Sequence, residues 1–191
     1  MGFFDTLFGN ARLPKARPER LFSMATAYLA METSLGWAPA GRAGICLKPV
    51  TAGDFVHTAE ELAGLIRLAV KETSTQLQIT EDEYRFRWFI FQDPDFEDLV
   101  TLGHMVAQTL EDHGYGEQLL SAVFRFLRRE AGDQPAYFVY NYKRGAFYPF
   151  VPVGQQQRDN ASELRASAIL DKELPLEKDL ERWYALWNCP V

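Results

Sequence analysis

Apolar residues in the first half of the chain recur every three or four positions, which is the spacing of an amphipathic helix. This spacing predicts one helix over residues 18–35 and another over residues 58–74. Thr58 and Glu61 form a capping box at the start of the second of these helices. We therefore expect two helices in the first half of the chain that can each cover part of a sheet.

The second half of the chain carries further stretches with helical spacing. Asp93, followed by a proline, favours the start of a helix that ends at Gly114. Helical spacing resumes over residues 117–130, so we expect these two helices to form a hairpin. Two short helices, over residues 160–172 and 175–187, are predicted to pack on the body of the protein.

Strands are predicted where polar and apolar residues alternate or where aromatic residues form short runs. Two paired strands are expected over residues 75–80 and 84–91, and a β-hairpin over residues 136–142 and 146–153. One short strand, over residues 45–47, is expected between glycines and prolines. Together with the helices, these strands predict an α+β fold in which a small antiparallel sheet packs against helices.

The turn of the predicted hairpin spans Lys143, Arg144 and Gly145, and the glycine can adopt a left-handed conformation. Pro149 in the second strand of the hairpin has no N–H group to donate to a neighbouring strand. We therefore expect this strand to lie at an edge of the sheet or to contain a bulge.

The composition favours one globular domain. The chain has 191 residues, of which 47% are apolar and 24% are charged, and this is enough to bury a sizeable core. We expect a single α+β domain over residues 18–191, with a C-terminal helical pair from about residue 158. An amphipathic N-terminal segment and a basic linker, residues 1–17, precede this domain.

Charge and cysteine content narrow the class of protein. The formal net charge of −6 argues against a general nucleic-acid binder, because neutralising phosphates requires a surplus of lysine and arginine. Cys46 and Cys189 are too few for a disulfide framework. We expect both thiols to stay reduced in the cytoplasm.

The N-terminal segment has an apolar helical face made of four large side chains: Phe3, Phe4, Leu7 and Phe8. These side chains either fold back onto the core or contact a membrane surface or a partner. No apolar stretch reaches the roughly 18 residues that a membrane-spanning helix needs. We therefore predict a cytoplasmic protein that can lie peripherally at the inner face of the membrane.

The sequence contains no recognisable catalytic or metal-binding motif. A nucleophile elbow, a zinc-protease motif and a pair of zinc-binding cysteines are all missing. His57, His104 and His113 lie far apart, and the acidic residues at 93–98 lack the glycine of a calcium loop. We expect neither an enzyme nor a bound metal or cofactor.

One glycine-containing stretch with basic residues is a candidate ligand loop. Its backbone and side chains offer a weak nest for a phosphate group. These residues are Gly41, Arg42, Gly44 and Lys48. The alternative function is therefore a sensor domain that responds to a small ligand or a nucleotide.

Three segments resemble the family of PspA-associated proteins called PspAB. They read Met-Gly-Phe-Phe-Asp-Thr-Leu-Phe-Gly at residues 1–9, Leu-Phe-Ser-Met-Ala-Thr-Ala at 21–27 and Gly-Arg-Ala-Gly-Ile-Cys-Leu-Lys-Pro-Val at 41–50. Residues 91–100 also fit, so the resemblance covers nearly the whole chain. It implies a non-enzymatic accessory protein or adaptor of a phage-shock-type envelope stress response.

The partner that this resemblance implies is PspA, a coiled-coil protein that binds stressed membranes. The resemblance brings no catalytic residues with it, and homo-oligomers of the chain are also compatible with it. We expect the protein to act by protein-protein contact, with membrane-surface contact as a further possibility.

The order of the predicted elements is similar, by analogy, to the secretion-chaperone-like α+β fold. Proteins of that shape bind partner segments along a sheet edge or a helix groove. In this chain the tyrosines of the predicted hairpin are the corresponding candidates for groove or sheet contact: Tyr137, Tyr140, Tyr142 and Tyr148.

Overall fold

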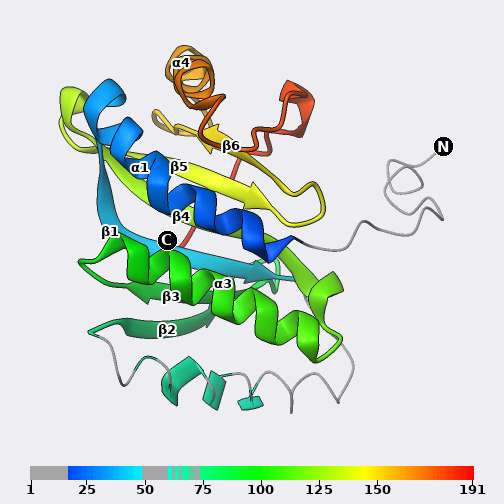
Figure 1. The fold of residues 1–191 in the computed structure, drawn as a ribbon. Helices are drawn as coiled ribbons and strands as arrows, with labels where there is room; N and C mark the ends of the chain where they lie inside the picture. Colours follow the sequence, from blue (N-terminus) through cyan, green and yellow to red (C-terminus); the bar gives the residue numbers. More distant parts are fainter. Residues whose placement is uncertain (1–16, 49–59, 62, 65, 69, 71–73) are drawn as a thin grey trace, which may run out of the picture.

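Six antiparallel strands form one sheet in the order β2-β3-β1-β4-β5-β6 (Figure 1). The computed structural model describes residues 17–48, 60–61, 63–64, 66–68, 70 and 74–191. The strands are β1 (Trp37–Leu47), β2 (Gln76–Glu81), β3 (Arg87–Gln92), β4 (Leu119–Arg128), β5 (Gln134–Asn141) and β6 (Ala146–Phe150). The long strand β1 lies in the middle of the sheet because it pairs with both β3 and β4.

Helices cover one face of this sheet. The N-terminal helical stretch consists of η1 (Pro18–Ser23), α1 (Met24–Ala30) and η2 (Met31–Leu35), and α3 (Phe96–Asp112) runs beside it in Figure 1. Further helical elements are α4 (Asn160–Leu170) and the short turns η3 (Gly116–Gln118), η4 (Arg129–Ala131) and η5 (Leu180–Arg182). These elements confirm the predicted α+β class and the helix predicted over residues 18–35.

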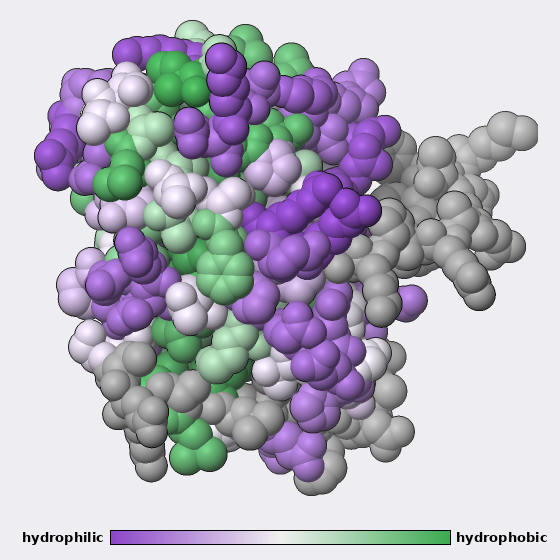
Figure 2. Space-filling view, in the orientation of Figure 1, coloured by the Kyte–Doolittle hydropathy of each residue, from purple (hydrophilic) through white to green (hydrophobic). Residues whose placement is uncertain are grey.

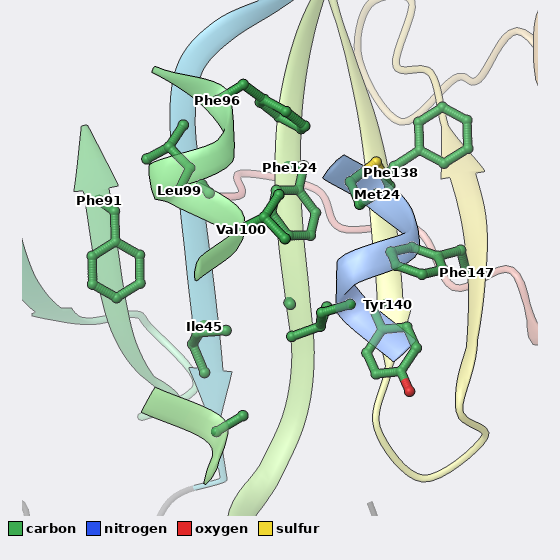
Figure 3. Close-up of a cluster of buried hydrophobic side chains, with 14 of the residues drawn as sticks. Met24, Ile45, Phe91, Phe96, Leu99, Val100, Phe124, Phe138, Tyr140 and Phe147 are labelled. Carbon is green, nitrogen blue, oxygen red and sulfur yellow. The ribbon is translucent and has the colours of Figure 1, made fainter. Parts of the chain in front are cut away.

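The main core lies between the sheet and the helices (Figure 3). Phe96 of α3 packs against Phe124 and Phe126 of β4, with ring centroids 5.8 and 5.4 Å apart. Met24 of α1 and Tyr140 of β5 are fully buried in the same cluster. Burial of this many aromatic and aliphatic side chains is the main force that holds the helices on the sheet.

The outer surface of the helical side is mixed in character. Hydrophilic and hydrophobic residues are interspersed in the view of Figure 2. Among the exposed apolar residues, Phe22 of η1 stacks against His104 of α3 with ring centroids 4.5 Å apart, and Leu29 of α1 is 54% exposed. Scattered apolar residues of this kind are normal on a protein surface.

The helix predicted over residues 117–130 is wrong, because this segment is strand β4. Phe124 and Phe126 face the helices, whereas Val123 belongs to the cluster on the opposite face. A strand that is covered on both faces is apolar along nearly its whole length. Its periodicity therefore does not distinguish it from a helix, and the predicted helical hairpin does not form.

A strand is present at residues 45–47 as predicted, but the observed strand is much longer than the predicted one. Strand β1 has 11 residues, from Trp37 to Leu47. Its pairing with β4 shifts between Pro39 and Ala43, and Gly41 has a φ of +65° within this bulge. Glycines and a proline that suggest a loop in the sequence are therefore accommodated by a bulge inside a strand.

The two strand pairs predicted over residues 75–91 and 136–153 are confirmed, as β2–β3 and β5–β6. Gly145 in the β5–β6 turn has a φ of +65°, as expected. Strand β6 lies at an edge of the sheet, in agreement with the effect of Pro149, although it ends already at Phe150.

The helix predicted between Asp93 and Gly114 is confirmed as α3, but Asp93 is not its N-cap. The side chain of Asp95, two residues after Asp93, accepts the capping hydrogen bond from the Glu97 N–H at 2.9 Å. Asp93 itself is buried, and its carboxylate accepts hydrogen bonds from Thr75 and from the Asp95 N–H. The helix predicted over residues 58–74 is helical at the described positions between 60 and 70. Its predicted start at residue 58 lies outside the described residues, and residue 74 is a bend.

The carboxyl end of the chain forms a strap, residues 177–191, on the face of the sheet opposite the helices. In Figure 1 this segment, coloured orange to red, passes behind the sheet. It contains one short turn, η5, so the helix predicted over residues 175–187 is wrong, whereas its neighbour α4 is confirmed. The chain just before the strap is extended, because the Phe147 N–H donates to the Pro175 carbonyl and the Glu177 N–H donates to the Phe147 carbonyl.

Candidate functional site

A groove of about 1040 Å³ opens between the strap and one end of the sheet. We call it the strap groove. It is lined by the end of β1, the β2–β3 turn, the carboxyl end of α3, the start of β4, the β5–β6 turn and the strap itself, with one residue each from β3 and β6. Segments that lie far apart in the sequence therefore meet at one site.

The floor and wall of the strap groove are aromatic. Trp88 of β3 and Tyr148 of β6 are buried on the strap side of the sheet, and Trp187 lies on the strap. The Trp187 ring packs edge-on against Phe150, with centroids 5.1 Å apart. Large rigid rings of this kind form the apolar anchors of many binding sites.

Two tyrosines stand exposed at the groove. Tyr84 in the β2–β3 turn is 68% exposed and Tyr184 in the strap is 54% exposed. The turn that carries Tyr84 is held by Asp82, whose carboxylate accepts hydrogen bonds from the Tyr84 N–H at 3.0 Å and from the Trp88 indole N–H at 2.9 Å. The position of Tyr84 is therefore fixed by the fold.

One buried polar group of the groove has no hydrogen-bond partner in the part of the chain that the structure describes. This group is the Tyr142 hydroxyl, at the end of β5. The residue is only 1% exposed, and burial raises its pKa well above 10, so the hydroxyl is protonated at neutral pH. A buried hydroxyl without a hydrogen-bond partner is an energetic cost to the fold.

Charges of both signs surround the groove. Arg144 pairs with Glu177 at 2.9 Å, and Asp112 accepts a hydrogen bond from Gln108 at 2.8 Å. Lys48 and Lys143 form no ion pair with any residue that the structure describes. The rim therefore offers unused positive charge beside an acidic helix end.

Both cysteines line the groove, and both are free thiols. Burial raises the pKa of Cys46 far above its ordinary value and raises that of Cys189 to about 11. Neither sulfur is a thiolate at neutral pH, so neither is activated as a nucleophile. The described residues also contain no group of three or more His, Cys, Asp or Glu side chains that could hold a metal ion.

The structure separates the four predicted contact tyrosines. Tyr137 and Tyr148 belong to the cluster under the strap, whereas Tyr140 and Tyr142 face the helices. All four are buried, and the Tyr140 hydroxyl donates to the Arg17 carbonyl at 2.7 Å. Tyr142 and Tyr148 line the strap groove, whereas Tyr137 and Tyr140 do not.

The predicted ligand loop is not a loop. Gly41, Arg42 and Gly44 lie within strand β1, and Lys48 directly follows it. A Cβ atom on Gly44 would lie 2.6 Å from Cγ2 of Val191, so the strap occupies the space beside this glycine. The backbone of this segment is therefore paired in the sheet, and Lys48 reaches the strap groove.

The predicted contact residues of the N-terminal segment, Phe3, Phe4, Leu7 and Phe8, lie outside the described residues. Conversely, sequence reasoning missed Tyr84, Trp88 and the strap residues Tyr184 and Trp187. Several aromatic residues lie near the carboxyl end of the sequence and could have indicated a site there, but their spacing predicts the buried face of a helix.

These features define an α+β protein with a strap across one sheet face and a large aromatic groove beneath it. The model of one family, PspAB (PspA associated protein B), matches residues 1–191. The chain belongs to this family, as its sequence resemblance indicated. No curated protein and no solved structure matches the chain, so the likeness to secretion chaperones remains an analogy. Among the described residues no helix is long and apolar enough to cross a membrane.

Proposed function

We propose that this protein is a non-enzymatic accessory protein of a phage-shock-type stress response, and that it binds PspA through the strap groove. The family description supports a role in association with PspA. The observation that carries the choice of site is the groove of about 1040 Å³ with an aromatic floor and two exposed tyrosines. We further propose that the protein works in the cytoplasm, where PspA reaches the inner face of the membrane.

The size of the strap groove favours a protein segment over a small metabolite. Drug-sized ligands occupy sites of roughly 300–1,000 Å³, so this groove lies at the upper limit of that range. A segment with several apolar side chains fills such a volume by placing them against Trp88, Tyr148 and Trp187. The exposed Tyr84 and Tyr184 then close over the segment, as aromatic hot spots do in interfaces.

The charges of the rim favour a partner segment that carries both signs. Lys48 and Lys143 attract carboxylates, and Asp112 at the carboxyl end of α3 attracts lysines or arginines. Coiled-coil helices have apolar residues on one side and charges of both signs beside them. A helical segment of PspA with this pattern is the occupant that we propose.

Tyrosine replacement at the mouth of the groove is expected to weaken PspA binding. For the double variant Tyr84→Ser and Tyr184→Ser, we expect the Kd for purified PspA to rise by about 30-fold, which corresponds to the loss of about 2 kcal/mol at an aromatic hot spot. Both side chains are more exposed than buried, so the melting temperature should stay unchanged. Isothermal titration calorimetry measures the Kd.

Leu29→Ser is the matched control, since Leu29 is 54% exposed on α1, on the helical side of the sheet. This variant should bind PspA as the unmodified protein does. Equal loss of binding in both variants, or undiminished binding of the tyrosine variant, would contradict the groove as the PspA site. Heat from a small metabolite in place of PspA would favour the alternative sensor function.

A second, separable contact is proposed for the N-terminal segment. Replacing Phe4 and Leu7 by aspartate puts two charges on its apolar face and should abolish recruitment to anionic liposomes, because a charged face does not enter the lipid interface. Liposome co-sedimentation measures recruitment, and thermal unfolding checks that the fold is retained. Recruitment that survives the change would show that this segment is not the membrane contact.

A further inference from the structure

Two arginines lie next to each other on the strap side of the sheet. Arg42 is in β1 and Arg125 is in the neighbouring strand β4. The register passes from Pro39 opposite Phe126 to Ala43 opposite Phe124, so the bulged residues 40–42 lie across from Arg125. Ala43 and Phe124 face the helices, and side chains alternate along a strand, so Arg42 and Arg125 both point to the strap side.

Neither guanidinium has a carboxylate partner among the residues that the structure describes. Arg42 donates one hydrogen bond, from Nη2 to the Pro190 carbonyl at 3.1 Å. The Nε atoms of Arg42 and Arg125 are both buried and make no hydrogen bond in the described structure. An unsatisfied buried donor on a charged group is costly, and here two such donors occur side by side.

Three other arginines of the described structure do have such partners. Arg128 pairs with Asp159 at 3.1 Å, Arg144 with Glu177 at 2.9 Å and Arg158 with Glu163 at 2.9 Å. The Nε atom of Arg128 is also buried without a hydrogen bond, but this arginine has its carboxylate partner. Arg42 and Arg125 differ from these three arginines, because no carboxylate of the described residues lies within ion-pair distance of either.

The two charges act on the same small region. Burial raises the pKa of Cys189 to about 11, and Arg42 and Arg125 both work against this rise. They have the same effect on Tyr137, whose pKa burial also raises. Since charge interactions fall off with distance, both guanidiniums lie near these two side chains.

We propose that Arg42 and Arg125 form a binding site for a phosphate-type oxyanion. Guanidinium groups donate paired, parallel hydrogen bonds that match the oxygens of a phosphate group. A phosphate group bound between the two guanidinium groups would remove the repulsion between the two cations. The site lies outside the strap groove, whose lining includes neither arginine, and does not depend on the proposed PspA contact.

The test titrates sodium phosphate into the protein at constant ionic strength and follows the arginine Nε–H signals by NMR and the melting temperature by calorimetry. We expect saturable shifts of the Arg42 and Arg125 signals at millimolar phosphate, together with a rise in melting temperature, because a ligand of the folded state stabilises it. If the NMR signals shift in proportion to the phosphate concentration without saturating, and chloride shifts them equally, the proposal is overturned.

Variants distinguish a specific phosphate site from a general effect of positive charge on the protein. Arg125→Gln should weaken phosphate binding by at least about tenfold, a loss of about 1.4 kcal/mol. Without phosphate the same variant should melt no lower than the unmodified protein, because one of two like charges is gone. Arg125→Lys keeps the charge but loses the planar fork, and it should bind more weakly than arginine does. Arg165→Gln on the exposed side of α4 is the matched control and should bind normally.

Vesicle binding distinguishes two sources of the phosphate group, a lipid headgroup and a free phosphorylated molecule. Phosphatidylcholine vesicles with and without phosphatidic acid are compared for binding to the unmodified protein and to Arg125→Gln. Binding that needs both phosphatidic acid and Arg125 assigns the site to a lipid headgroup. Phosphate binding without vesicle binding assigns it to a free phosphorylated molecule. Undiminished phosphate binding by Arg125→Gln would show that these arginines are not the site.

Discussion

Replacement of Glu163 by glutamine is expected to lower the free energy of unfolding by about 3 kcal/mol, the usual cost of removing one member of a buried ion pair. Glu163 is 1% exposed, and its carboxylate accepts two hydrogen bonds from Arg158 Nε, both 2.9 Å long. It also accepts the Val151 N–H at 2.8 Å. Glutamine retains an acceptor for Val151 but leaves the Arg158 charge without its counter-charge.

The effect should extend to the strap, because Arg158 connects three elements. Its Nη1 donates to the Trp183 carbonyl at 2.7 Å, and its guanidinium lies 5.3 Å from the centre of the Phe150 ring. Burial raises the pKa of Glu163, while the hydrogen bonds from Val151 and Arg158 oppose that rise. These hydrogen bonds therefore favour the charged form of the carboxylate against the effect of burial.

Equilibrium urea unfolding measures the loss, with Glu173→Gln as the matched control, since Glu173 is exposed just after α4. The control should change stability by less than about 0.5 kcal/mol. Adding Arg158→Met to Glu163→Gln should restore part of the loss, because the unpaired charge is then absent. Equal stability of Glu163→Gln and the unmodified protein would show that this ion pair does not hold α4 and the strap.

The second large effect is expected from Gly44→Ala, which should loosen the end of the strap. A Cβ atom at this position would lie 2.6 Å from Cγ2 of Val191 and 3.3 Å from the Phe89 carbonyl oxygen. Val191 is buried against the sheet, and Cys189 lies two residues before it. The added methyl group must therefore displace Val191, at a cost of about 1–3 kcal/mol for overpacking.

The readout that separates a loosened strap from general instability is the reaction of Cys189 with a thiol reagent under native conditions. Burial raises its pKa to about 11, so reaction should be slow in the unmodified protein. We expect it to become about tenfold faster in Gly44→Ala, as local opening exposes the thiol at a cost lower by about 1.4 kcal/mol. The reaction rate is followed in a protein that carries Cys46→Ser.

Two companion variants make this experiment decisive. Gly103→Ala in α3 places its methyl group 3.7 Å from Ile45 Cδ1, an ordinary contact, so this identical substitution should leave the Cys189 rate unchanged. Gly44→Ala should cost less stability in a protein that already carries Val191→Ala than in the unmodified protein, because the clashing methyl group is then absent. An unchanged thiol rate in Gly44→Ala would mean that Val191 does not fasten the strap.

Predictions from sequence succeeded for helices that bury one side only and for strand pairs with a clear turn. The helix over residues 18–35, α3 and α4 each bury one side, so the period of their residues identifies them. The strands β3, β5 and β6 are buried on both faces, and the turns between paired strands with alternating or aromatic residues identify the two hairpins. The prediction failed for β4, which is buried on both faces, and for β1, whose glycines and proline lie in a bulge. It failed again for the strap, where tryptophans at helical spacing pack on a sheet while the backbone is irregular.

The candidate site was the hardest part to predict. Tyr142 and Tyr148 were selected for their place in a hairpin, and both line the strap groove. Tyr84, Trp88 and Trp187 come from three other segments, and no spacing within the sequence relates them. Arg42 was selected as part of a loop, whereas its importance in the structure comes from Arg125 on the neighbouring strand.

The sequence by itself determined the α+β class, the family and most one-sided elements, because local periodicity and motif content depend only on neighbouring residues. Only the tertiary structure decided the sheet order, the identity of β4 and the groove under the strap. These depend on which distant segments bury each other, as Val191 does against Gly44, and on strand register. Long-range packing is a property of the whole chain, and it brings together the residues of both proposed sites.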